Sequence, residues 1–273
     1  MQKAILGAKQ NGYDLLEIPL LNPEEVDVPS TNRLLAEHNL TPSASLGLRL
    51  DADISSADAE CAARGEELLR SALYVANKLG VHHLCGVIYS AIDKYPGPPT
   101  AEGRDNSIRA LRRIAAEAKD LGMVLCCEVI NRYESNLLNT AAQAREFIEE
   151  IGADNVMIHL DTFHINIEEP GFAAAVATAG EKLAYVHIGE SHRGYLGTGT
   201  IDFQEFFRSL ADLGYQGPVT FESFSSRVVS PYLSTHLCVW RDLWDDSDVL
   251  ATQAREFMVN QIESANKYKA LQQ

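Results

Sequence analysis

The sequence lacks long apolar runs and an excess of positive charge, and each lack excludes a class of protein. None of its apolar stretches approaches the roughly 18 consecutive residues of a transmembrane helix, so no membrane partner is expected. Its 23 lysines and arginines stand against 38 aspartates and glutamates, which gives a formal net charge of −15. Such an acidic surface disfavours binding to nucleic acid or anionic membranes and favours a small-molecule partner.

Paired cysteines are lacking too. The five cysteines are an odd number, and no two of them form a CxxC motif. Adjacent Cys126 and Cys127 lie in an apolar run, and as neighbours on a strand they should point to opposite faces. We interpret all five as reduced thiols. The N-terminus has charge and glycine where a signal peptide has an apolar stretch, so a cytoplasmic location is expected.

The sequence does contain a regular alternation of strand-like and helix-like stretches. Strands are expected at 15–20, 41–48, 81–88, 123–130, 155–161, 183–188 and 218–223, and helices at 2–12, 30–39, 58–79, 104–121, 140–151, 171–178, 203–213 and 248–267. This alternation predicts a parallel sheet wrapped by helices. No linker or second domain is recognisable. Residues 1–273 are therefore predicted to form a single α/β domain, a (β/α)8 TIM barrel.

The predicted barrel has seven recognisable strands instead of eight, and the first strand is the one that is lacking. The first expected element is the helix at 2–12. It resembles the helix that would connect the first two strands of a barrel, but no strand precedes it in the sequence. A missing strand would leave unpaired edges in a parallel barrel. Three explanations stay open: the protein starts before Met1, the barrel is an open seven-stranded variant, or another segment fills the gap.

Four short apolar runs, each within an expected strand, end in a residue that can bind a metal. These residues are Glu128, Asp161, His187 and Glu222, which follow one another at intervals of 26 to 35 residues, about one strand–helix unit. The carboxyl ends of the parallel strands of a barrel meet around one cavity. We therefore expect the four side chains to converge there as metal ligands.

The ligand set also indicates the metal and its chemistry. Three carboxylates facing one another repel unless a cation neutralises them. Oxygen ligands with one imidazole suit Mn²⁺, Mg²⁺ or Co²⁺ better than a structural zinc. Such a metal would polarise a substrate carbonyl and acidify the neighbouring C–H. Glu128 and Glu222, from opposite sides of the ligand series, would then remove and return the proton with inversion, which is an epimerisation.

Three residues close behind the ligands are candidates for binding a polyhydroxylated substrate. Glu134 lies six residues after Glu128, His164 three residues after Asp161, and Arg193 six residues after His187. Together they offer donors and acceptors for the carbonyl end of a sugar. An ordinary loop ion pair is the alternative interpretation for each.

Four segments carry a family resemblance. EVINRYESNLLNT, HLDTFHINIEE, YVHIGESHRGYLGTGTIDF and FESFSS resemble the ketose 3-epimerases, which include the D-tagatose, D-psicose and L-ribulose 3-epimerases. These enzymes belong to the xylose-isomerase-like barrels, and the resemblance runs from about residue 4 to residue 267. It implies an isomerase that epimerises free ketoses at C3: L-ribulose and L-xylulose, D-psicose and D-fructose, or D-tagatose and D-sorbose.

The resemblance also implies roles for particular residues. Glu128, Asp161, His187 and Glu222 would be the metal ligands, Glu128 and Glu222 the catalytic acid/base pair, Glu134, His164 and Arg193 the groups that hold C1 to C3, and Gly86 and Val87 part of the pocket wall. The family uses one divalent cation, with Mn²⁺ the expected ion and Mg²⁺ or Co²⁺ as alternatives. Its members form homodimers or homotetramers.

Other functions remain open from the sequence. An aldose–ketose or hydroxypyruvate-type isomerase on the same fold would move the proton between C1 and C2. A metal-dependent nuclease on a related barrel would carry more histidine ligands and a basic face, which the charge of −15 disfavours. The lack of a first strand also leaves an inactive truncated barrel as an alternative.

Overall fold

Seven parallel strands form one curved sheet in which each strand pairs with its neighbours in sequence order. The structure is a computed structural model and describes residues 1–272. The strands are β1 (Leu15–Pro19), β2 (Thr41–Ser45), β3 (His83–Gly86), β4 (Val124–Val129), β5 (Val156–Asp161), β6 (Leu183–Ile188) and β7 (Val219–Phe221). The sheet is a nearly closed barrel of the TIM type, so the prediction of seven strands and of this fold is confirmed.

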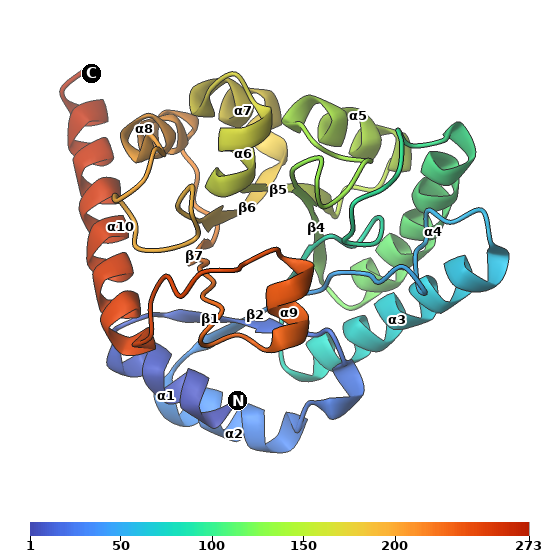
Figure 1. Cartoon of the computed structure of the whole chain (residues 1–273), viewed down its shortest axis with the longest axis horizontal. Coiled ribbons are helices and arrows are strands. Elements are labelled where there is room, and N and C mark those ends of the chain that lie inside the picture. Colours follow the sequence, from blue (N-terminus) through green and yellow to red (C-terminus); the bar gives the residue numbers. More distant parts are fainter. Residues whose placement is uncertain (273) are drawn as a thin grey trace.

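Helices surround the strands (Figure 1). They are α1 (Gln2–Gln10), α2 (Val28–His38), α3 (Ala59–Lys78), α4 (Ala101–Asp120), α5 (Ala141–Ile151), α6 (Thr162–Glu168), α7 (Phe172–Ala179), α8 (Phe203–Leu213), α9 (Pro231–His236) and α10 (Ser247–Ala270), with 3-10 turns at Pro23–Glu25 and Gly180–Lys182. In this view α9 lies in front of the strands, whereas the other helices form the outer ring. No helix within residues 1–272 is both long and apolar enough to cross a membrane.

Local signals explain where the helices begin. α2 starts at Val28, two residues earlier than expected, because the Asp27 side chain accepts the backbone N–H of Ser30 and Pro29 is tolerated in the first turn. Similarly, the Thr100 side chain caps α4. The short helices α6 and α9 were not expected from the sequence, since neither is long enough to show a helical period.

The two faces of the sheet pack differently. Leu125, Cys127 and Val129 of β4 belong to the large apolar core between sheet and helices. Cys126, on the other face, packs with Cys85 and Tyr185 inside the barrel. The expectation that Cys126 and Cys127 point to opposite faces is therefore confirmed. Because side chains alternate along a strand, Glu128 shares the inward face with Cys126.

The edge strands β1 and β7 are connected by side chains instead of a backbone ladder. Among the described residues, the strand pairing runs from β1 to β7 and does not close the ring. Tyr185 of β6 donates a hydrogen bond to Glu17 of β1 (2.8 Å) and accepts one from Thr220 of β7 (2.9 Å). This Thr220–Tyr185–Glu17 bridge links the two edges through the barrel interior.

Candidate active site

Strand register brings the four predicted ligands to one end of the barrel. Asp161 and His187 are register partners on β5 and β6. Glu128 is the fifth of the six residues of β4, next to β5. Glu222 follows β7 directly, and its backbone N–H donates to the carbonyl of Ile188 at 3.1 Å. The sheet thus places all four at the carboxyl ends of neighbouring strands, the end where TIM barrels carry their active sites.

The side chains of these residues converge. One ligand atom each from Glu128, Asp161 and His187 lie within 4.8 Å of one another. Nδ1 of His187 is 3.6 Å from Oε1 of Glu128 and 3.6 Å from Oε1 of Glu222. Glu128, Asp161 and His187 are buried, whereas Glu222 keeps 26% of its side chain exposed. Three of the predicted ligands are thus buried, and Glu222 is partly exposed to solvent.

The donor set fits a divalent cation. Nδ1 of His187 is buried and makes no hydrogen bond within the described part of the chain, although it faces two carboxylates. A buried imidazole nitrogen without a partner costs free energy, and a metal ion would give it one. Carboxylate oxygens and one imidazole are ligands that Mn²⁺ and related ions accept. Glu128, Asp161, His187 and Glu222 are therefore the residues that would hold it.

Burial and mutual repulsion perturb these carboxylates. Burial raises the pKa of Glu128, and the neighbouring charges of Glu222 and Asp161 raise it further. Burial also raises the pKa of Glu222. Burial alone would raise the pKa of Asp161, but the charges of Arg193, His164 and His187 and the Phe163 backbone N–H together outweigh it and lower that pKa. Groups with opposed shifts in one cavity are typical of catalytic sites.

Arg193 lies among the ligands. Its Nη1 donates to Oδ2 of Asp161 (2.9 Å) and to Oε2 of Glu222 (2.6 Å), and its guanidinium lies 3.8 Å from the centre of the Phe163 ring. The Arg193 backbone has a φ of 63°, which is rare for a residue with a side chain. The structure therefore places this residue, expected at the substrate, in contact with two of the predicted ligands.

A buried carboxylate holds the loop that carries Arg193. Glu190 is fully buried and accepts the backbone N–H groups of Ser191 (2.8 Å) and Gly197 (2.9 Å). A Cβ on Gly199 would lie 2.3 Å from Oε1 of Glu190, so this close approach requires glycine. Sequence analysis did not single out Glu190. The only available signal was its position two residues after β6, within a glycine-rich loop.

His164 and Glu134 meet through a residue that sequence analysis also missed. Asn131 donates from its side chain to Oε1 of Glu134 (2.7 Å), and its backbone N–H donates to Nδ1 of His164 (3.1 Å). Burial lowers the pKa of His164 to about 3, so the ring is neutral at physiological pH. Nε2 of His164 lies 3.9 Å from Glu128 and 3.8 Å from Asp161. His164 thus borders the ligand cluster, and Glu134 is linked to His164 through Asn131.

Gly86 is the last residue of β3, and Val87 follows it. Gly86 has a φ of 108°, and a Cβ there would lie 2.4 Å from the carbonyl oxygen of Leu46, so the close approach of β2 and β3 requires glycine. Val87 is 98% buried and packs in the main core. Their expected role in the pocket wall stays a prediction.

Glu17 is a further residue that the sequence reading overlooked. Its Oε2 lies 2.8 Å from Nε2 of His187, on the ring edge opposite the unpaired Nδ1. Burial alone would raise the pKa of Glu17, but the charge and hydrogen bond of His187 outweigh it and lower that pKa to about 2. A single carboxylate within the apolar stretch LLEIP was the signal in the sequence.

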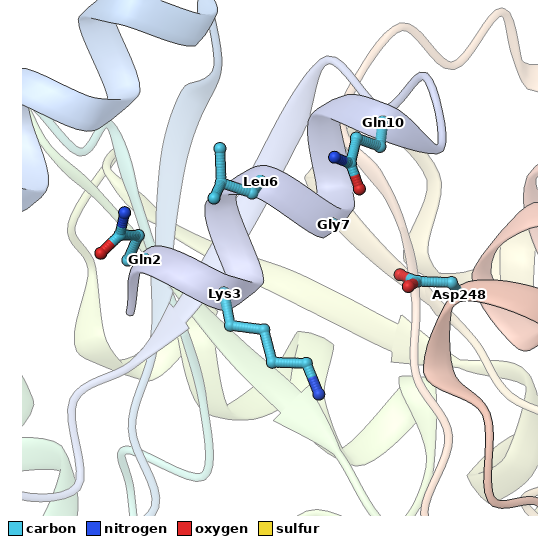
Figure 2. A pocket seen from close by; sticks show the side chains of 6 residues that line it. All are labelled: Gln2, Lys3, Leu6, Gly7, Gln10 and Asp248. Carbon is cyan, nitrogen blue, oxygen red and sulfur yellow. The ribbon is translucent and has the colours of Figure 1, made fainter.

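A surface hollow lies apart from this cluster. It has a volume of about 370 Å³ and is lined by Gln2, Lys3, Leu6, Gly7, Gln10 and Asp248, from α1 and the start of α10 (Figure 2). None of these residues is a candidate ligand or acid/base group. This hollow is therefore not part of the candidate active site.

Comparison with known proteins places the chain in a family. Residues 6–261 match the model of the family described as "Xylose isomerase-like TIM barrel". An L-ribulose 3-epimerase from Methylomonas sp. (strain DH-1) is 53% identical over 257 residues, which cover 94% of this chain and 90% of the relative. A ketose 3-epimerase from Arthrobacter globiformis is 51% identical over 250 residues, covering 92% of this chain and 86% of the relative.

Solved structures agree with these relatives. The crystal structure of D-allulose 3-epimerase from Methylomonas sp. in complex with D-allulose superposes with a TM-score of 0.94 at 53% identity, covering 95% of this chain and 90% of that one. A structure of L-ribulose 3-epimerase gives a TM-score of 0.96 at 42% identity, covering 99% and 91% of the two chains. The chain thus belongs to the xylose isomerase-like TIM barrel family and, within it, to the ketose 3-epimerases, which are isomerases.

Proposed function

We propose that this protein epimerises free ketoses at C3 in a reaction that depends on one divalent cation. The observation that carries the proposal is the convergence of three carboxylates on the unpaired Nδ1 of His187 at the carboxyl ends of β4 to β7. The relatives named for L-ribulose, ketose and D-allulose 3-epimerisation support the reaction class. Candidate substrate pairs are L-ribulose and L-xylulose, D-psicose and D-fructose, and D-tagatose and D-sorbose.

The cation is proposed to be Mn²⁺, with Mg²⁺ or Co²⁺ as substitutes. Glu128, Asp161, His187 and Glu222 would hold it, and when bound it would polarise the ketose carbonyl and lower the pKa of the C3–H. Mixed oxygen and nitrogen ligands favour these ions over calcium, which takes oxygen ligands alone in larger number.

Two carboxylates would move the proton. Glu222 and Glu128 come from the two sides of β5 and β6, so they can address opposite faces of a planar enediolate. One of the pair takes the proton from C3 while the carbonyl electrons move to O2. The other returns a proton to C3 from the opposite face, and the carbonyl at C2 is restored. The net change is inversion at C3, and the pair exchanges its protonation state in each turnover.

Arg193, His164 and Glu134 would orient the sugar. The guanidinium of Arg193 offers donors next to Glu222 of the proposed acid/base pair and next to Asp161, and the neutral ring of His164 lies between Glu128 and Asp161. These groups suit the O1, O2 and O3 atoms at the reacting end of a ketose. A homodimer or homotetramer and a cytoplasmic location complete the proposal.

A substrate panel tests this proposal. Purified protein with added Mn²⁺ is incubated separately with L-ribulose, D-fructose and D-tagatose, and the products are separated by chromatography. We expect the C3 epimer of at least one ketose, since the acid/base pair addresses C3. Products that are aldoses only would instead indicate a 1,2-isomerase, and no product from any ketose would indicate an inactive barrel.

A further inference from the structure

The hydrogen bond between Glu17 and His187 joins two distant parts of the chain at the proposed metal centre. Glu17 lies on β1 and His187 on β6, and their side chains meet at 2.8 Å inside the barrel. The same Oε2 atom of Glu17 accepts the hydroxyl of Tyr185 at 2.8 Å. Glu17 is not one of the proposed ligands, and His187 is the proposed ligand with which it shares a hydrogen bond.

The orientation of the His187 ring gives this bond a chemical consequence. A neutral imidazole carries its single proton on one nitrogen, and only the other nitrogen has a lone pair for a metal. Glu17 is a carboxylate and can only accept, so it fixes the proton of His187 on Nε2. The lone pair then lies on Nδ1, the atom that faces Glu128 and Glu222 at 3.6 Å.

We propose that Glu17 is a positioning residue of the metal centre: it holds His187 in the orientation and tautomer in which Nδ1 binds the cation. Carboxylates that accept the second N–H of a metal-bound histidine raise the basicity of the ligand and fix its ring. The inference rests on the proposed cation, and it is independent of which sugar reacts.

A purely structural role for Glu17 is the competing explanation. Through Tyr185, the same carboxylate links to Thr220 and so connects the edge strands β1 and β7. If Glu17 served only this connection, removal of the Tyr185 hydroxyl would have the same effect as a change at Glu17. The two roles are therefore separable with matched variants.

The test compares Glu17→Gln with Tyr185→Phe in metal affinity, without sugar. Glutamine keeps the size of the side chain, but its neutral amide accepts more weakly and can donate to Nε2, which would move the proton to Nδ1. We expect Mn²⁺ to bind Glu17→Gln with a Kd about 10- to 100-fold higher than in the wild type. Tyr185→Phe should bind Mn²⁺ with nearly the wild-type Kd. Free Mn²⁺ is measured by electron paramagnetic resonance, and thermal unfolding of the metal-free proteins reports folding.

A measurement on the wild-type protein keeps the test independent of how the variants fold. With Mg²⁺ bound, ¹⁵N NMR of the histidine rings should show the His187 proton on Nε2. A wild-type Kd in Glu17→Gln, equal weakening in both variants, or a proton on Nδ1 would each overturn the inference. If the wild type bound no divalent cation at all, the failure would instead lie with the proposed metal centre.

Discussion

Glutamine in place of Glu222 is expected to abolish the interconversion of C3 epimers. The substitution removes one of the two groups that take and return the C3 proton, and general acid–base catalysis contributes about 10²- to 10⁴-fold to a rate. We expect kcat to fall by at least that factor, and Glu128→Gln to have an equally severe effect. Product formation from the ketose that the wild type converts best is the measurement.

Hydrogen exchange separates a proton-transfer role from a role as ligand only. In D₂O, a variant with one remaining acid/base group should still exchange the C3 hydrogen of one epimer, and the two variants should exchange opposite epimers. Glu150→Gln is a matched control, because Glu150 lies on the surface of α5 and pairs with Arg104. It should keep wild-type turnover. Substantial interconversion by Glu222→Gln or Glu128→Gln would contradict the two-carboxylate mechanism.

Removal of the divalent cation is expected to abolish turnover and to lower thermal stability. Glu128, Asp161 and Glu222 are carboxylates gathered around Nδ1 of His187, which has no hydrogen-bond partner within residues 1–272, so a bound cation would neutralise their repulsion and give Nδ1 a partner. A cation at 100 times its Kd would stabilise the folded state by about 2.7 kcal/mol. Dialysis against a chelator should therefore lower the unfolding temperature measured by calorimetry and stop epimerisation.

Restoration by added metal identifies the ion. Mn²⁺ should restore both activity and unfolding temperature, Co²⁺ and Mg²⁺ should do so in part, and Ca²⁺ should restore little activity, because the imidazole ligand disfavours it. Glu150→Gln should respond to chelation and re-addition like the wild type. Full activity in protein proven metal-free by elemental analysis would exclude the proposed role of the cation.

The sequence was sufficient to predict which residues at the strand ends come together in the candidate site. Strands β4 and β5 are mostly apolar, so the carboxylates Glu128 and Asp161 stand out near their carboxyl ends. In a parallel sheet the carboxyl ends of all strands lie at the same edge, whatever the details of side-chain packing. The convergence of these residues with His187 therefore followed from spacing alone.

The supporting residues could not be found in the same way. Glu17 contacts His187 because the barrel curves far enough for side chains of β1 and β6 to meet in its interior, and nothing local in LLEIP encodes that closure. The reach of Arg193 depends on a loop with a left-handed residue and on the buried Glu190. Such contacts arise from tertiary structure, and they cannot be predicted from hydrophobic periodicity or from residues at strand ends.

The most direct test of the central claim is the position at which solvent hydrogen enters the sugar. The Mn²⁺-loaded protein is incubated in D₂O with the ketose that it converts, and both sugars are recovered, freed of metal and examined by ¹H NMR. Proton transfer at C3 through an enediolate predicts one deuterium at C3 in the epimer formed, with none at C1. Deuterium at C1, or an aldose product, would contradict C3 epimerisation and indicate proton transfer between C1 and C2.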